Sequence, residues 1–169
     1  MLVATTTRTS RVHQEPVTAS TLPIDDPGIL AWRTFLTAHA TLIRRLDAEL
    51  EEREALALSD FDVLAQLHFA GGTLRMRDLA DSVLLSRSGM TRRVDRLEAA
   101  GFVSRAACET DRRGSMASLT DAGRERFERA LPVHVQGIAD HFLCHLAPDE
   151  LASLRTTLAK LLPPDRRPG

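Results

Sequence analysis

The sequence has few cysteines and no long apolar run. Among its 169 residues only Cys108 and Cys144 are cysteines, and their spacing forms no CxxC pair. This argues against a disulfide framework and against a zinc site built from clustered cysteines. No apolar stretch approaches the roughly 20 residues that a membrane-spanning helix needs, and the segment from Met1 to Ser20 lacks the apolar core of a secretory signal. We therefore expect a cytoplasmic protein without a membrane partner.

Common signatures of catalysis are also missing. The sequence contains no Ser–His–Asp pattern, no paired-carboxylate signature, no phosphate-binding loop and no metal-binding box. We predict that the chain is not an enzyme and that it needs no cofactor.

Positive and negative charges are nearly balanced overall, but the positive ones are concentrated in one region. The net charge is −1, and Lys160 is the only lysine. Between Leu84 and Ser115, seven arginines stand against four acidic residues, a surplus of three positive charges, whereas acidic residues gather between Asp47 and Glu54. An apolar content of 43% and a charged content of 27% are typical of a globular protein. A local basic region in such a protein is a feature of nucleic-acid binding.

Two short helices separated by a tight turn are predicted within this region. The apolar positions of the first are Leu79, Ala80 and Val83, and those of the second are Met90, Val94 and Leu97, at spacings of four and three residues. The opposite face of the second helix carries Ser88, Thr91, Arg92, Asp95 and Arg96. Gly101 follows directly, where the end of a helix favours a residue that tolerates positive φ.

A hairpin is predicted after the second helix. Residues 102–105 and 115–119 are short extended candidates, and the segment between them is charged. Residues 73–75 are a further extended piece that could join the hairpin as a third strand. Two helices, a tight turn and a basic-tipped hairpin predict a winged helix-turn-helix, whose second helix suits a DNA major groove.

Several short motifs resemble the MarR (multiple antibiotic resistance regulator) family of transcription factors. They are Leu79-Ala80, Met90-Thr91-Arg92, Asp95-Arg96-Leu97-Glu98, Gly101-Phe102-Val103, Asp111-Arg112-Arg113-Gly114 and Leu119-Thr120-Asp121-Ala122-Gly123. The resemblance runs from about Ala31 to Leu162. It departs from the family pattern at Glu109-Thr110, where the family often has Asp-Pro.

Long apolar helices flank the winged unit, and we expect both to take part in dimerisation. The expected fold is mainly α with a small β-hairpin wing (α+β). The expected parts are a flexible arm over 1–27, an N-terminal dimerisation helix over 28–58, a winged helix-turn-helix DNA-binding domain over 59–119 and C-terminal dimerisation helices over 120–164. Apolar stripes at both ends of a small domain imply a homodimer, and the resemblance implies that the terminal helices interlock.

Details of the helix ends follow from local signals. Ser59 is expected to cap the second long helix, and Thr120 is expected to cap the helix after the wing. We expect Pro132 to bend that helix, which should continue past Phe142. A final helix should start near Pro148 and end before Pro163.

DNA contacts are expected from the second helix and from the wing. Ser86 should cap the helix, which places Arg87, Ser88, Thr91, Arg92 and Arg96 toward base edges or phosphates. Arg93 is expected to point toward the protein instead. Arg112 and Arg113 can reach an adjacent minor groove. By resemblance, Arg113 is the groove arginine and Asp111 is the residue that orients it.

A ligand site is suggested by Trp32, Arg33, His39 and His68 on the two helices before the winged unit. An aromatic ring, a fixed cation and imidazoles suit a small aromatic acid, and the resemblance implies lipophilic anions in this region. Ordinary packing explains the same residues equally well. His141 and His145, four residues apart with Cys144 beside them, could instead bind metal, and Cys108 could oxidise.

We therefore predict a transcriptional repressor that binds double-stranded DNA at a palindromic operator as a homodimer and is released by a small, aromatic anionic ligand. Two alternatives stay open. One is a metal- or redox-responsive regulator of the same fold, and the other is a winged-helix interaction module that does not bind DNA.

Overall fold

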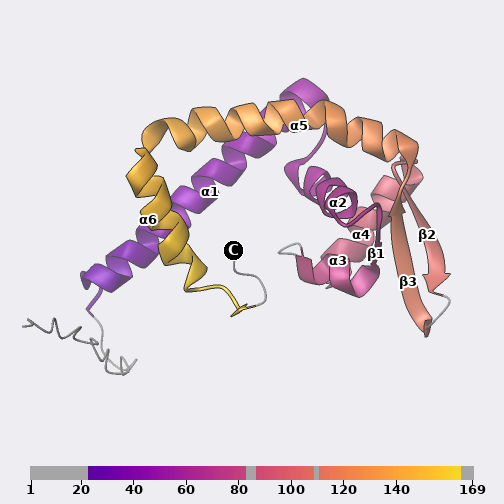
Figure 1. Cartoon of the computed structure of the whole chain (residues 1–169), viewed down its shortest axis with the longest axis horizontal. Helices are drawn as coiled ribbons and strands as arrows, with labels where there is room; N and C mark the ends of the chain where they lie inside the picture. The colour runs from indigo at the N-terminus through magenta and orange to yellow at the C-terminus, as the bar shows by residue number, and fades with distance from the viewer. Residues whose placement is uncertain (1–22, 83–86, 109–110, 165–169) are drawn as a thin grey trace, which may run out of the picture. The chain divides into compact units, whose positions relative to one another are not determined.

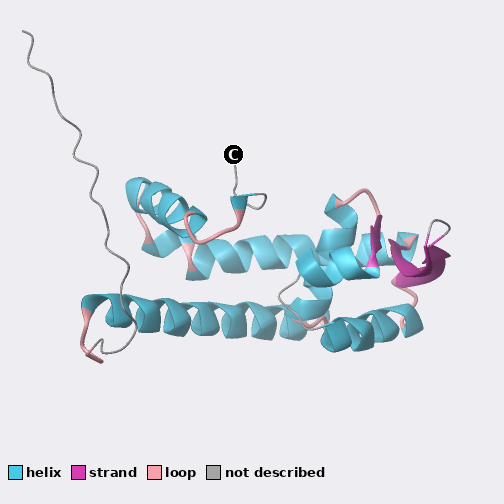
Figure 2. Ribbon diagram, turned by 90° about the horizontal axis from the view of Figure 1, so that it is seen from below, coloured by secondary structure: helices cyan, strands magenta, loops and turns pink. Residues whose placement is uncertain are grey.

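A computed structural model describes residues 23–82, 87–108 and 111–164, without the side chains of 87, 88, 108 and 111–114. Helices dominate these residues, and three short strands form one sheet (Figures 1 and 2). The elements are α1 (Pro27–Glu54), α2 (Leu58–Phe69), β1 (Thr73–Arg75), α3 (Met76–Ser82), α4 (Arg87–Ala99), β2 (Val103–Cys108), β3 (Asp111–Leu119), α5 (Asp121–His141), a 3-10 turn (Leu143–His145) and α6 (Pro148–Ala159). The predicted fold class, mainly α with a β-hairpin wing, is confirmed. Within the described ranges, no helix is both long and apolar enough to cross a membrane.

The chain divides into two compact units, residues 1–37 and residues 38–169. In the described part of the first, Asp26 Oδ1 accepts a hydrogen bond from the backbone N–H of Gly28 at 2.8 Å, which caps the start of α1. The rings of Trp32 and Phe35 lie 6.0 Å apart in the same unit. The site described below belongs to the second unit.

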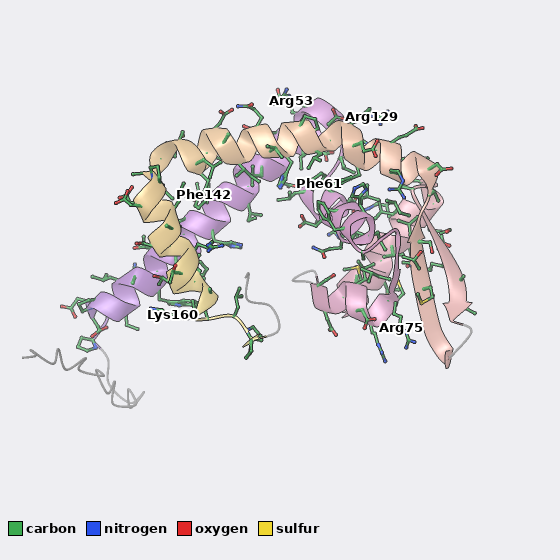
Figure 3. The ribbon with its side chains drawn as sticks, in the orientation of Figure 1. Arg53, Phe61, Arg75, Arg129, Phe142 and Lys160 are labelled. Atoms are coloured by element: carbon green, nitrogen blue, oxygen red, sulfur yellow. The ribbon has the colours of Figure 1, made fainter. Side chains whose placement is uncertain are left out.

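Packing of α2 against α5 forms the centre of the second unit. Phe61 and Phe127 stack at a centroid distance of 5.4 Å, and Figure 3 shows Phe61 on α2 below α5. The largest fully buried side chains include Leu50, Leu64, Leu67, Leu79, Met90, Leu97 and Phe127. The apolar faces predicted for α2 and α4 are therefore buried, whereas α6 has no buried residue and α1 buries only Leu46 and Leu50.

The sheet has the strand order β1-β3-β2, with both pairs antiparallel. Arg75 pairs with Met116, and Arg105 pairs with Ala117. The expected third strand is confirmed, and it adds to the hairpin of β2 and β3 that Figure 1 shows as paired arrows. Gly72 has φ of +98°, and its carbonyl accepts from Leu119 N at 2.7 Å, so the turn after α2 is tied to the end of the hairpin.

Thr120 joins both ends of the wing to the start of α5. Its Oγ1 accepts a hydrogen bond from Gly123 N at 3.0 Å, which confirms the predicted cap, and donates one to the Gly101 carbonyl at 2.8 Å. Its backbone N–H donates to the Phe102 carbonyl at 3.1 Å. We refer to these three hydrogen bonds as the Thr120 clasp.

The predicted cap at Ser59 is wrong. α2 begins at Leu58, after Ala57 in extended conformation, and Asp47 Oδ1 of α1 accepts from Leu58 N at 2.8 Å. A carboxylate from the preceding helix thus satisfies one of the free N–H groups at the start of α2. The hydroxyl of Ser59 is hydrogen-bonded to Arg93 instead.

Of the two C-terminal helices, only α5 ends elsewhere than expected. α5 continues through Pro132 but ends at His141, before Phe142, and a 3-10 turn follows. α6 begins at Pro148, as predicted, and ends at Ala159. Glu150 Oε2 accepts from Ala147 N at 2.8 Å and supports the start of α6.

Candidate nucleic-acid interface

The two faces of α4 differ sharply in exposure. Met90, Val94 and Leu97 are 1%, 0% and 2% exposed and hold the helix on the core. The other side presents Thr91, Arg92, Asp95 and Arg96 to solvent. Apolar residues at spacings of four and three anchor the helix along one stripe and leave the polar residues outside, so α4 presents a continuous polar surface, as a recognition helix does.

Asp60 connects this helix to the start of α2. Its Oδ1 accepts from Arg93 Nη1 at 3.1 Å and from Arg96 Nη2 at 2.9 Å, although Asp60 is only 8% exposed. Arg93 is also hydrogen-bonded to Ser59. The inward direction predicted for Arg93 is confirmed. Arg96 keeps 59% of its side chain exposed and so remains accessible while it is paired.

The environment of Asp62, two residues after Asp60 on α2, was not predicted from the sequence. Burial raises the pKa of its carboxyl, and the positive charge of Arg93 opposes that rise. In the sequence, this residue stood out only as the acid three residues after the expected cap at Ser59. Arg93 therefore lies among two acidic residues and a hydroxyl of α2.

The arginines of the basic region differ in how far their side chains are exposed to solvent. Arg93 and Arg105 expose only 22% and 23% of their side chains. Arg92 is exposed and forms no ion pair with any residue in the described ranges. Among Arg92, Arg93 and Arg96, the arginines of α4 whose side chains are described, it is therefore the one best placed to meet an external anion.

Several predicted contact residues lie outside what the structure describes. These are Ser86 and the side chains of Arg87, Ser88, Asp111, Arg112 and Arg113. The backbone shows that α4 begins at Arg87 and β3 at Asp111. Cys108 pairs with Asp111 after a register shift between Ala107 and Cys108.

The four residues proposed for a ligand are spread over both compact units. Trp32, 54% exposed, and Arg33 belong to the first unit, and His39 and His68 belong to the second. The half-buried ring of His68 lies 4.6 Å from that of Phe127, and its Nδ1 lies 3.5 Å from Arg124 Nη1. His68 thus packs on the core of its own unit.

The suggested metal site on one helix face is not formed. His141 ends α5 and binds Glu49 Oε1 at 2.5 Å, whereas Cys144 and His145 follow in the 3-10 turn. Cys144 Sγ donates to the carbonyl of Asp140 at 2.9 Å. Across the described ranges, no group of three or more His, Cys, Asp or Glu side chains is arranged to hold a metal ion.

Comparison with known proteins places this geometry among DNA-binding regulators. The sequence model of the MarR family matches residues 56–114. The HTH-type transcriptional regulator PecS of Dickeya dadantii is 30% identical over 128 residues, which cover 75% of this chain and 76% of PecS.

Two solved structures from Streptomyces coelicolor are similar as well. The MarR family transcriptional regulator AbsC is 34% identical with a TM-score of 0.77, over 83% of this chain and 95% of that one. The MarR family transcriptional regulator Sco3205, solved in complex with DNA, is 32% identical with a TM-score of 0.72, over 80% of this chain and 88% of that one.

Proposed function

Because this chain belongs to the MarR family of transcriptional regulators, we propose that it binds a palindromic DNA operator as a homodimer, represses transcription there and is released by a small aromatic anion. It is a transcription regulator and not an enzyme. We expect the protein to act in the cytoplasm, where the DNA lies.

The observation that carries the proposal is the outer face of α4. Arg92 is exposed without an ion-pair partner in the described ranges, next to Thr91 and Arg96. Arginine reads guanine edges by paired hydrogen bonds in the major groove. A similar protein, Sco3205, was solved with DNA. The proposed DNA contacts are Ser86, Arg87, Ser88, Thr91, Arg92 and Arg96 at the recognition helix, and Asp111, Arg112 and Arg113 at the wing.

Exposed apolar side chains support a homodimer. Those on α1 and α5 include Leu30, Trp32, Phe35, Leu36, Ile43 and Val135, each at least 40% exposed. Such surface is normally covered by a partner. Two recognition helices about 34 Å apart can then read a palindrome in successive major grooves. We expect a dimer mass by light scattering at micromolar concentration, and a monodisperse monomer would contradict palindromic recognition.

The proposed ligand residues are Trp32, Arg33, His39 and His68. Trp32 offers an exposed ring, 54% accessible, and Arg33 beside it carries a fixed positive charge. We expect the ligand to bind more tightly to a dimer whose recognition helices are not spaced to fit the operator. The binding free energy for DNA then weakens by the free energy of that preference, typically about 1–3 kcal/mol. An aromatic carboxylate is the ligand class that uses both the ring and the cation.

The test is binding to the DNA upstream of the chain's own gene, measured with and without a panel of aromatic acids. Arg92→Ala should weaken operator binding by about five- to 150-fold, the range of one lost base contact, and should affect random DNA less. Arg129→Ala, on the exposed side of α5, is the matched arginine control. Equal losses on both DNAs would make Arg92 a phosphate contact, and a dimer that binds no upstream DNA would fit an interaction module.

The proposed release by a ligand is tested separately, by tryptophan fluorescence. Trp32 is the only tryptophan, so an effector should quench its emission at the concentrations that release DNA. Arg33→Ala and His39→Ala should weaken release without weakening DNA binding. If no acid quenches Trp32 or dissociates the complex, the ligand site is wrong while the DNA-binding function stands.

A further inference from the structure

The side chain of Arg105 crosses from the wing to the recognition helix. Its Nη2 lies 2.6 Å from Asp95 Oδ1 and donates to the carbonyl oxygen of Thr91 at 3.1 Å. Its Nε lies 3.5 Å from Glu98 Oε2, and its backbone N–H donates to Glu98 Oε1 at 3.2 Å. One residue of β2 therefore holds three residues of α4.

The three partners form a single stripe along α4. Thr91, Asp95 and Glu98 follow each other by four and three residues, so they lie one above the other on the helix surface. Thr91 and Glu98 are about 10 Å apart along the helix axis. Arg105 reaches both because its backbone N–H and Nε lie at Glu98, whereas its Nη2 lies at Thr91 and Asp95. The contact therefore fixes the tilt of α4 against β2 and not merely one distance.

Charge balance sets Arg105 apart from the exposed arginines. Its side chain is 23% exposed, and two carboxylates of α4 lie beside its guanidinium. A phosphate would have to displace those carboxylates to pair with it. Arg92, by comparison, faces solvent with no ion-pair partner in the described ranges.

We propose that Arg105 is a positioning residue for DNA recognition, which holds the wing at a fixed angle to the recognition helix and does not itself contact DNA. A helix in a major groove and a wing in the adjacent minor groove must be placed together, and small errors in such geometry reduce binding strongly. The inference rests on the proposed DNA-binding function and adds to it the residue that couples the two reading elements.

The experiment compares Arg105→Ala and Arg105→Lys for binding to operator and to random DNA. We expect Arg105→Ala to weaken operator binding about tenfold and random binding much less. Arg105→Lys keeps the charge but offers one compact ammonium, which cannot bridge the stripe, so it should restore little. Arg126→Lys is the matched control, since it changes another ion pair, with Glu54 at 2.7 Å, on α5. That variant should lower the melting temperature and leave the operator-to-random ratio unchanged.

A double-mutant comparison separates positioning from a direct contact. If Arg105 places the wing, Arg113→Ala should weaken operator binding less in the Arg105→Ala background than in the wild type, because the wing is already misplaced. Additive losses, restoration by lysine, or equal losses on operator and random DNA would overturn the proposal and make Arg105 a phosphate contact. An unchanged operator affinity in Arg105→Ala would overturn it as well.

A measurement without DNA keeps this inference distinct from the proposed function. In the free protein, Arg105→Ala should accelerate amide hydrogen exchange in β2 and in the second half of α4, but not in α2. Exchange that is unchanged in both elements would overturn the proposal whether or not DNA binds. If exchange is accelerated but the protein binds no DNA, the result supports the coupling of β2 to α4 through Arg105. It then contradicts only the proposed function.

Discussion

Asp60 and Arg96 form an ion pair of 2.9 Å that joins the buried start of α2 to the exposed side of the recognition helix. The same carboxylate oxygen also accepts from Arg93 at 3.1 Å. Two arginines three residues apart on α4 thus share one acceptor on a different helix. The orientation of α4 is therefore held from α2 on one side and from β2 through Arg105 on another.

Removing the charge of Asp60 should loosen α4. In Asp60→Asn, the amide keeps the size of the side chain but replaces an anion that two arginines share, so we expect a loss of about 1–3 kcal/mol in the free energy of unfolding. Urea denaturation measures it. Arg96→Ala should cost less than Arg93→Ala, because 59% of the Arg96 side chain is in solvent. A stability of Asp60→Asn equal to the wild type would show that the pairs do not hold the helix.

The wing tip should contribute to affinity through one arginine. Arg113→Ala should weaken operator binding and reduce the slope of log affinity against log salt by about one, as expected for one lost phosphate or groove contact. Dimer mass and melting temperature should stay as in the wild type. An unchanged affinity and slope would show that the tip does not touch DNA.

Gly123 should not tolerate a side chain. A Cβ atom there would lie 2.0 Å from the Phe102 carbonyl oxygen and 2.9 Å from Leu119 Cδ1. Because the first obstacle is backbone, Gly123→Ala should destabilise by about 1–3 kcal/mol or more, measured by thermal unfolding. Gly71→Ala is the comparison: its φ is +81° but nothing lies within 4 Å of the added Cβ, so it should cost about 1 kcal/mol. Equal losses would mean that α5 can shift away from Phe102.

The free energy of unfolding should depend on pH through His134. This half-buried ring lies 4.5 Å from Phe61, and its Nδ1 is buried without a hydrogen-bond partner in the described part of the chain. Burial lowers the pKa of His134 below its ordinary value of 6.5. The unfolded chain therefore binds the proton more readily, and the free energy of unfolding falls as pH falls below about 6.5.

His134→Gln isolates that contribution because glutamine does not titrate. The drop in melting temperature between pH 7.5 and pH 5 should be smaller in this variant than in the wild type. An equal drop in both proteins would assign the pH dependence to other groups. His145→Gln, an exposed histidine in the 3-10 turn, serves as the control and should keep the full drop.

Most of the fold was predicted from the spacing of apolar residues. The hydrogen-bond and ion-pair partners of the charged residues could not be predicted from that spacing. Met90, Val94 and Leu97 repeat at helical intervals, and burial of such a stripe is the same in any fold that packs a helix on a core. The cap at Thr120 is also local, since it joins residues three apart, whereas the strand at residues 73–75 pairs with residues 116–118 and was expected only as an extended piece that could join the hairpin. These features were predicted and are present.

Arg105 and Asp62 show why the rest was not predictable. In the sequence, Arg105 counts as one more cation of a basic region, and only the pairing of β2 brings it to Glu98. Asp62 becomes half-buried because α4 covers α2 there. The error at Ser59 has the same origin, since the acceptor for Leu58 N comes from Asp47, eleven residues away.

The Thr120 clasp makes the wing an exchangeable part of the molecule. The chain leaves the frame at Gly101 and Phe102 and returns at Thr120, and hydrogen bonds from that one residue reach both departure points. Loop closure therefore occurs at the base of the hairpin, and the tip can vary in length and sequence without changing the distance between the strands where they join the helices. A transplanted hairpin would therefore have to match this chain at its two ends, at the β3 residues that pair with β1, and at Arg105, which contacts α4.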